Sequence, residues 1–89
     1  MSDPRRTKPS RATSMPAIAR IGSQLAARRV ELRLTQAMLA DLAGVSRSSI
    51  QALEYGSGSV KFASVVDIAD ALGLRLEPIP AATPTETEQ

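Results

Sequence analysis

The sequence predicts an all-α domain of four to five short helices, followed by one short C-terminal strand. Aliphatic residues recur at intervals of three and four, which is the spacing of a buried helix face. Thr or Ser stands directly before two of these periodic segments and Gly follows two of them, as at helix starts and ends. With 89 residues, 43% of them hydrophobic but only one Tyr and one Phe, the chain can build one small domain with an aliphatic core.

The net charge of +2 is unevenly distributed along the chain. Residues 1–61 hold ten Lys or Arg against four Asp or Glu, whereas residues 62–89 hold one Arg against five acids. A basic N-terminal part and an acidic C-terminal part suit a protein that binds phosphate groups through one end only. The alternative is a solvated surface with an acidic terminus.

Several function classes are disfavoured by composition. The chain has no Cys and no His, so disulfides, thiolate nucleophiles and the usual zinc ligand sets are not expected, and neither is any cofactor. An enzyme is the least expected class, because general acid or base candidates reduce to scattered Asp and Glu. No apolar run approaches the roughly 20 residues of a membrane span, and no hydrophobic stretch follows the N-terminal basic residues as in a secretory signal. We therefore expect a cytoplasmic protein, associated with the nucleoid when bound.

Three regions are expected. Residues 1–16 are polar, basic and interrupted by proline, and they are predicted to be a disordered arm. Residues 17–80 form the folded domain, and residues 81–89 form a disordered acidic tail. The arm could follow a nucleic-acid backbone, or it could be an ordinary disordered terminus.

The first helix is predicted over residues 17–32, where Ile18, Ile21, Leu25 and Leu32 recur at helical spacing. The second is predicted over residues 36–43. Thr35 can cap its start, and Gly44 can end it in the left-handed conformation.

Val45 then fills the corner before a third helix, which Ser46 can cap. Ile50 and Leu53 of this helix are expected to face the core, while Arg47, Ser48 and Gln51 project outward. Two short helices around a Gly-Val corner are typical of a helix-turn-helix, which places its second helix in the major groove of DNA.

A fourth helix is predicted over about residues 63–72, ended by Gly73. The next segment, Leu74, Arg75, Leu76 and Glu77, alternates apolar and charged side chains and precedes Pro78. It is typical of a strand, but no second strand candidate exists to pair with its edge. Pairing with the same strand of another copy would solve this and give a two-fold dimer. The alternative is an extended tail lying over its own helices.

The stretch from Ile21 to Gly73 resembles the phage-repressor or Xre-type helix-turn-helix domain. The matching pieces, in order, are Leu-Thr-Gln at 34–36, Leu-Ala at 39–40, Ala-Gly-Val-Ser at 43–46, Ile50 with Glu54 and Gly56, and Ile-Ala-Asp-Ala-Leu-Gly at 68–73. The tail Leu-Gly-Leu-Arg-Leu-Glu-Pro at 72–78 is similar to the HipB-like branch, in which such a strand pairs across the dimer. That branch consists of DNA-binding antitoxins and autorepressors, so the resemblance implies three partners: double-stranded DNA, a second copy of the chain and a HipA-like kinase toxin.

The chain departs from the family pattern at two places. Arg33 stands at the end of the first helix, where family members usually have Gly. A positive φ there would cost about 1 kcal/mol of strain. Lys61-Phe62 replaces the proline that is frequent near the start of the fourth helix.

The residues expected to contact DNA are Gln36, Ser46, Arg47, Ser48, Ser49, Gln51, Arg28 and Lys61. Arg47 is suited to guanine O6 and N7, or alternatively to a phosphate, and Gln51 is suited to adenine. Ser46 is expected to be a helix cap first and a ligand second. Arg28 and Lys61 are candidates for phosphate contacts, with simple solvation as the alternative. By resemblance, Gln36 binds a phosphate and braces the third helix.

By the same resemblance, Arg29 and Glu54 form a structural ion pair between the first and third helices. Dimerisation is assigned to Leu74, Arg75, Leu76 and Glu77. The predicted function is a dimeric repressor or autorepressor on an inverted repeat, and the antitoxin of a HipA-like kinase. The alternative is a protein-interaction module that mainly sequesters a toxin, with DNA binding secondary.

Overall fold

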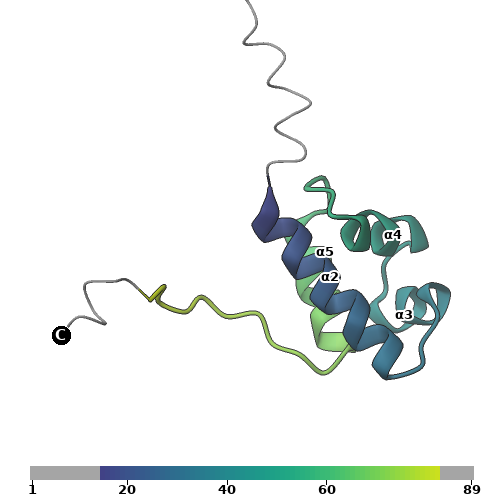
Figure 1. The fold of residues 1–89 in the computed structure, drawn as a ribbon. Coiled ribbons are helices and arrows are strands. Elements are labelled where there is room, and N and C mark those ends of the chain that lie inside the picture. The colour runs from purple at the N-terminus through teal and green to yellow at the C-terminus, as the bar shows by residue number, and fades with distance from the viewer. Residues whose placement is uncertain (1–14, 83–89) are drawn as a thin grey trace, which may run out of the picture.

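The computed structural model describes residues 15–82, which form four helices (Figure 1). They are α2 (Pro16–Glu31), α3 (Gln36–Ala43), α4 (Arg47–Tyr55) and α5 (Phe62–Ala71). The all-helical prediction is confirmed: the second helix matches in its bounds, the third begins directly after its predicted cap Ser46, and the first and fourth each begin and end one residue earlier than predicted. The predicted arm and acidic tail lie almost entirely in residues 1–14 and 83–89, outside the described residues.

The local signals for helix starts are confirmed. The Thr35 hydroxyl accepts a hydrogen bond from the Met38 N–H at 3.0 Å, and the Ser46 hydroxyl accepts one from the Ser49 N–H at 3.1 Å. Each satisfies one of the N–H groups that a helix start leaves without an intrahelical partner. Helix α2 starts at Pro16, whose missing N–H costs nothing in the first turn.

All four helices end in the same backbone motif. A residue with positive φ follows each helix, and the N–H of the next residue reaches a carbonyl five residues back. The four bonds are Leu34 to Arg29 (3.0 Å), Val45 to Ala40 (3.1 Å), Ser57 to Ala52 (2.9 Å) and Leu74 to Ala69 (2.9 Å). The positive-φ residues are Arg33 (61°), Gly44 (71°), Gly56 (93°) and Gly73 (75°). Arg33 thus occupies a position that favours Gly, at a cost of about 1 kcal/mol.

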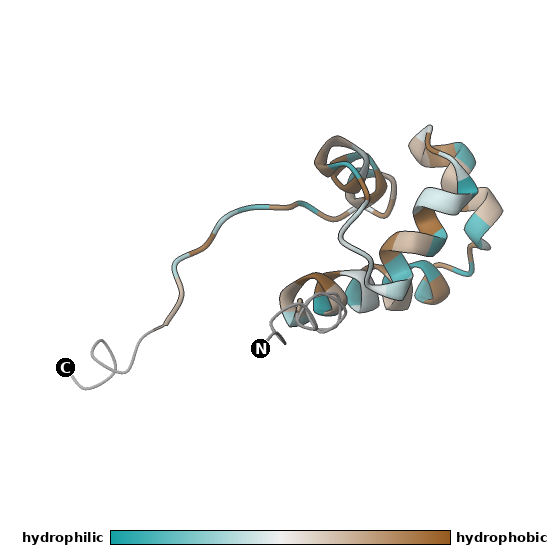
Figure 2. Ribbon diagram, turned by 90° about the horizontal axis from the view of Figure 1, so that it is seen from above, coloured by the Kyte–Doolittle hydropathy of each residue, from teal (hydrophilic) through white to brown (hydrophobic). Residues whose placement is uncertain are grey.

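The core is aliphatic and lies where the four helices meet. Its buried members are Leu25, Leu39, Ala40, Ile50, Leu53, Ile68, Ala69 and Leu72. Hydrophobic and hydrophilic residues alternate along each helix, so that each contributes one apolar side (Figure 2). Leu32 shares the predicted periodicity but is 40% exposed, because α2 ends at Glu31 and the chain turns away from the inward face.

Helices α2 and α4 cross in close contact at Gly22, a feature that the sequence analysis missed. A Cβ atom at Gly22 would lie 2.0 Å from the carbonyl oxygen of Leu53, far inside van der Waals contact. Only a residue without a side chain lets the two backbones approach this closely. Gly22 therefore sets the position of α4 relative to α2.

Residues 74–80 leave α5 as an extended segment, and no strand pairing is present within residues 15–82. The predicted strand is therefore not formed within the described single chain, since a strand needs a partner. Leu74 and Leu76 still pack against the core, while the segment then leads away from the helices (Figure 1). Arg75 and Glu77 are exposed and contact each other at 3.1 Å. None of the described helices has the length and hydropathy required to cross a bilayer.

Candidate nucleic-acid interface

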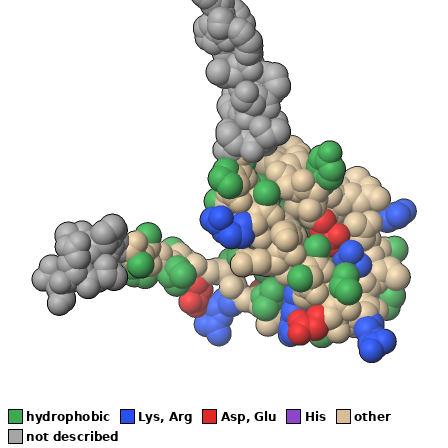
Figure 3. All heavy atoms as spheres, viewed as in Figure 1, with side chains coloured by type: hydrophobic (Ala, Val, Ile, Leu, Met, Phe, Trp, Pro, Cys, Tyr) green, Lys and Arg blue, Asp and Glu red, His purple; other side chains and the backbone are tan. Residues whose placement is uncertain are grey.

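Helix α4 has a buried side and a polar outward side. Ile50 and Leu53 are buried, which fixes the rotation of the helix about its axis. Arg47, Ser48 and Gln51 are exposed, and Arg47 makes no ion pair within residues 15–82. In Figure 3 Lys and Arg side chains lie at the right edge, where α3 and α4 are, and also on the left, so the visible face carries dispersed positive charge.

Three serines gather at the N-terminus of α4. The Ser46 hydroxyl oxygen lies 3.1 Å from that of Ser48 and 2.9 Å from that of Ser49, in addition to capping the helix. The N-terminal end of a helix carries a partial positive charge, and hydroxyl groups beside it can donate to an anion. This end of α4 is chemically suited to a phosphate or a base edge.

A polar hollow of about 540 Å³ extends from these serines to the start of α5. Its lining includes Ser46, Ser48, Ser49, Lys61, Ser64 and Asp67. The fold therefore brings Lys61 to the serines although it lies more than ten residues away in sequence. Ser64 and Asp67 were missed by the sequence analysis, although their spacing of three residues makes them neighbours on one face of α5.

Gln36, the first residue of α3, is linked to α4 through Glu54. The Gln36 side-chain amide donates to Glu54 Oε1 at 3.0 Å. Arg29 donates to the same carboxylate twice, from Nε to Oε2 at 2.6 Å and from Nη2 to Oε1 at 3.0 Å. Its third donor, Nη1, reaches the Leu34 carbonyl at 2.7 Å. One carboxylate thus connects α2, α3 and α4.

The surroundings of Glu54 keep it ionised. Burial, the largest single influence, raises the pKa of this carboxyl group. The hydrogen bonds from Arg29 and Gln36, together with the charge of Arg29, outweigh burial and hold the pKa below its ordinary value of 4.5. At neutral pH Glu54 is therefore ionised and accepts the hydrogen bonds that link α4 to Arg29 and Gln36.

Arg28, a predicted phosphate contact, does not lie with the polar residues at the start of α4. Its Nε donates to the Leu72 carbonyl at the end of α5 at 2.9 Å, and its Nη1 contacts Glu31 at 3.3 Å. A cation at the C-terminal end of a helix satisfies a carbonyl that has no intrahelical partner. The structure therefore places Arg28 beside the C-terminal segment, as a cap for α5.

A family model described as helix-turn-helix matches residues 25–79, which is 55 of the 89 residues. The matched range contains α3, α4 and α5, the polar hollow and the Glu54 carboxylate. Comparison with curated proteins gave no match.

Proposed function

Because the chain belongs to the Xre-like helix-turn-helix family, a family of DNA-binding regulators, we propose that it is a repressor that binds an inverted repeat as a dimer. The observation that carries the proposal is the two-sided α4, with Ile50 and Leu53 buried beneath an exposed Arg47, Ser48 and Gln51. A helix presented this way fits the major groove, where its first turns reach base edges. In a two-fold dimer the two half-site centres would lie about 34 Å apart, one helical turn of DNA.

Within each half-site the proposed roles follow from residue chemistry. Arg47 in the first turn of α4 binds guanine through two donors, and Gln51, one turn further on, pairs with adenine. Lys61 and the serine hydroxyls at the start of α4 bind phosphates on one side of the groove. Gln36 binds a phosphate at the start of α3 while its amide holds Glu54.

Selection of bound duplexes from random DNA tests this function. We expect an enriched inverted repeat, and Arg47→Ala should weaken its binding by about 1–3 kcal/mol while relaxing the preference at one base position per half-site. The measurement is competition binding against duplexes changed at each position. An equal loss on every duplex would make Arg47 a phosphate contact, and no preference among duplexes even at low ionic strength would contradict the repressor proposal.

The proposed dimer pairs residues 74–77 of two copies as antiparallel strands centred on Leu76. In this register Arg75 of each copy lies opposite Glu77 of the other, giving two attractive pairs. In the same register Leu74 of each copy lies opposite Pro78 of the other. Because Pro78 has no N–H, Leu74 and Pro78 cannot form a hydrogen-bonded pair. The Arg75–Glu77 positions then exchange the backbone hydrogen bonds, and the two Leu76 side chains meet where cross-strand distances are shortest.

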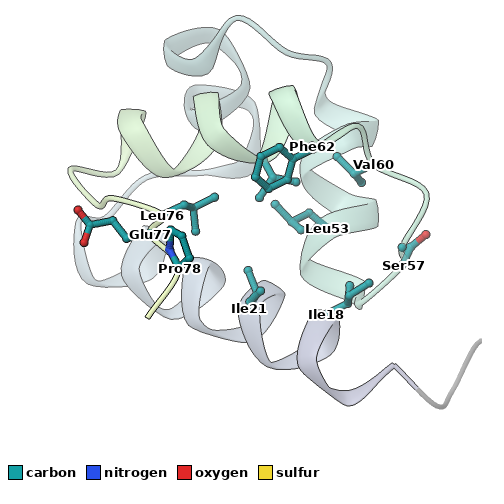
Figure 4. A pocket seen from close by; sticks show the side chains of 11 residues that line it. Ile18, Ile21, Leu53, Ser57, Val60, Phe62, Leu76, Glu77 and Pro78 are labelled. Atoms are coloured by element: carbon teal, nitrogen blue, oxygen red, sulfur yellow. The ribbon is translucent and has the colours of Figure 1, made fainter. Parts of the chain in front are cut away.

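The side chain of Leu76 also lines an open apolar hollow of about 450 Å³. Ile18 and Ile21 from α2 and Leu53 from α4 lie around it (Figure 4). Dimerisation would cover this apolar surface and satisfy the unpaired backbone groups of the segment together.

Charge exchange at the strand tests the register. Arg75→Glu should put like charges opposite each other twice and weaken the dimer several-fold, because each cross-strand pair is worth about 0.2–1 kcal/mol. Arg75→Glu combined with Glu77→Arg should restore it. Sedimentation equilibrium measures the dimer dissociation constant. A single variant as dimeric as the parent, or a chain truncated after Gly73 that stays dimeric, would contradict the proposal.

The finer proposal is a HipB-like antitoxin that also binds a HipA-like kinase. The similarity of residues 72–78 to the HipB-like branch supports this proposal. The alternative, a module that mainly sequesters a toxin, predicts tight partner binding without a preferred duplex. Co-purification with a kinase-like protein from the native host distinguishes the two.

A further inference from the structure

We propose that Arg33 is a further DNA-binding residue, which contacts a backbone phosphate beside the start of α3. The inference rests on the proposed DNA-binding function. The first supporting observation comes from the ends of the four described helices, which share one backbone motif. At the positive-φ position of this motif, three helices have Gly and α2 has Arg33. Gly would adopt this conformation without strain, whereas Arg33 strains the backbone at this position.

The side chain of Arg33 has no structural role among residues 15–82. It is exposed, and it makes neither a hydrogen bond nor an ion pair within that range. Of the other arginines within residues 15–82, Arg28, Arg29 and Arg75 each contact a carboxylate, whereas Arg20 and Arg47, like Arg33, make no ion pair there. What distinguishes Arg33 is that its exposed cation stands on a strained backbone position, where it is available to an anion outside the described chain.

The backbone around Arg33 is held rigidly and is tied to α4. Leu34, the residue after Arg33, makes two hydrogen bonds with Arg29. The Arg29 carbonyl accepts from the Leu34 N–H at 3.0 Å, and Arg29 Nη1 donates to the Leu34 carbonyl at 2.7 Å. The same Arg29 binds Glu54 on α4. Arg33 is thus fixed relative to the helix proposed to enter the major groove, so its charge is positioned before binding.

The position of Arg33 favours a phosphate over an acidic protein surface. It precedes Gln36, the first residue of α3, by three residues, and the start of α3 is where the proposed complex meets the DNA backbone. A single Arg that neutralises one phosphate contributes to affinity in a salt-dependent way that can be counted.

The test measures the affinity of the full chain for its selected duplex between about 50 and 200 mM salt. In a dimer, Arg33→Gly removes two phosphate contacts, so the parent should lose about twelvefold more affinity than the variant over this range. Arg33→Gln should behave like Arg33→Gly, and Arg33→Lys should retain most of the salt dependence. Arg33→Gly should also melt at a higher temperature than the parent, since its backbone strain is relieved, which separates weaker binding from misfolding.

Arg20→Gln is the matched control, because Arg20 is an exposed cation on α2 about 16 Å along the helix from its C-terminal end. It should leave the salt dependence unchanged. An Arg33→Gly chain with the full salt dependence overturns the assignment, as does an equal change in Arg20→Gln, which would indicate overall charge alone. Unchanged DNA binding by Arg33→Gly with loss of an acidic protein partner would assign Arg33 to that partner instead. A parent chain that binds no duplex overturns the repressor proposal itself.

Discussion

Replacing Gly22 with Ala should destabilise the domain by at least about 3 kcal/mol, a large fraction of the roughly 5–15 kcal/mol expected for a folded domain. In an isolated helix the same change would stabilise by about 1 kcal/mol, because Ala is the better helix former. The sign reverses here because the new Cβ would lie 2.0 Å from the Leu53 carbonyl oxygen. Backbone cannot rotate away as a side chain can, so α2 and α4 must separate and expose core residues.

Gly44→Ala is the matched control for this experiment. Gly44 has a positive φ of 71°, but apart from Gly44 and its two chain neighbours no atom of the described chain lies within 4 Å of the position that its Cβ would occupy. Ala there should cost only the conformational strain, about 1 kcal/mol. Urea denaturation of both variants measures the difference. A Gly22→Ala chain at least as stable as the Gly44→Ala chain would mean that α2 and α4 can move apart at little cost.

The contrast between these two glycines shows what sequence alone could predict. The role of Gly44 depends on its own chain neighbours, as do the caps at Thr35 and Ser46, and all three were predicted from local signals. The role of Gly22 depends on which carbonyl of another helix crosses it. Nothing within several residues of Gly22 encodes that crossing.

The candidate site divides in the same way. The outward face of α4 follows from helical periodicity, so the sequence alone is enough to place Arg47 and Gln51 on it. The proximity of Lys61 to the serines of α4 depends on the path of the loop between α4 and α5, which brings the start of α5 back beside the start of α4. The contact of Arg28 with the end of α5 is equally non-local, which explains why a solvated or phosphate-binding role was predicted for it.

Removing either partner of the Arg29–Glu54 pair should cost about 3 kcal/mol. The two side chains are only 15% and 12% exposed, so the remaining partner keeps a charge that water reaches poorly. Glu54→Ala would also leave the Gln36 amide without its acceptor and remove this side-chain link between α3 and α4. Glu31→Ala is the matched control, since the Arg28–Glu31 pair is 34% and 67% exposed and should contribute less than about 0.5 kcal/mol. Equal losses in the two variants would contradict the special role of Glu54.

The same pair predicts a pH dependence of stability. The pKa of Glu54 is lower in the folded chain than its ordinary value of 4.5, so the unfolded chain binds a proton more readily. The contribution of the ionised carboxylate to stability is therefore complete above about pH 4.5 and is lost as the pH falls through the folded-state pKa. Other carboxyl groups titrate in the same range, so the quantity to measure is the difference in unfolding free energy between the parent and Glu54→Gln. That difference should be constant well above pH 4.5 and should shrink as the pH falls below it, because protonation turns the parent's carboxylate into a neutral group resembling the amide. A difference that stays constant as the pH falls would mean that the carboxylate charge does not stabilise the junction of α2, α3 and α4.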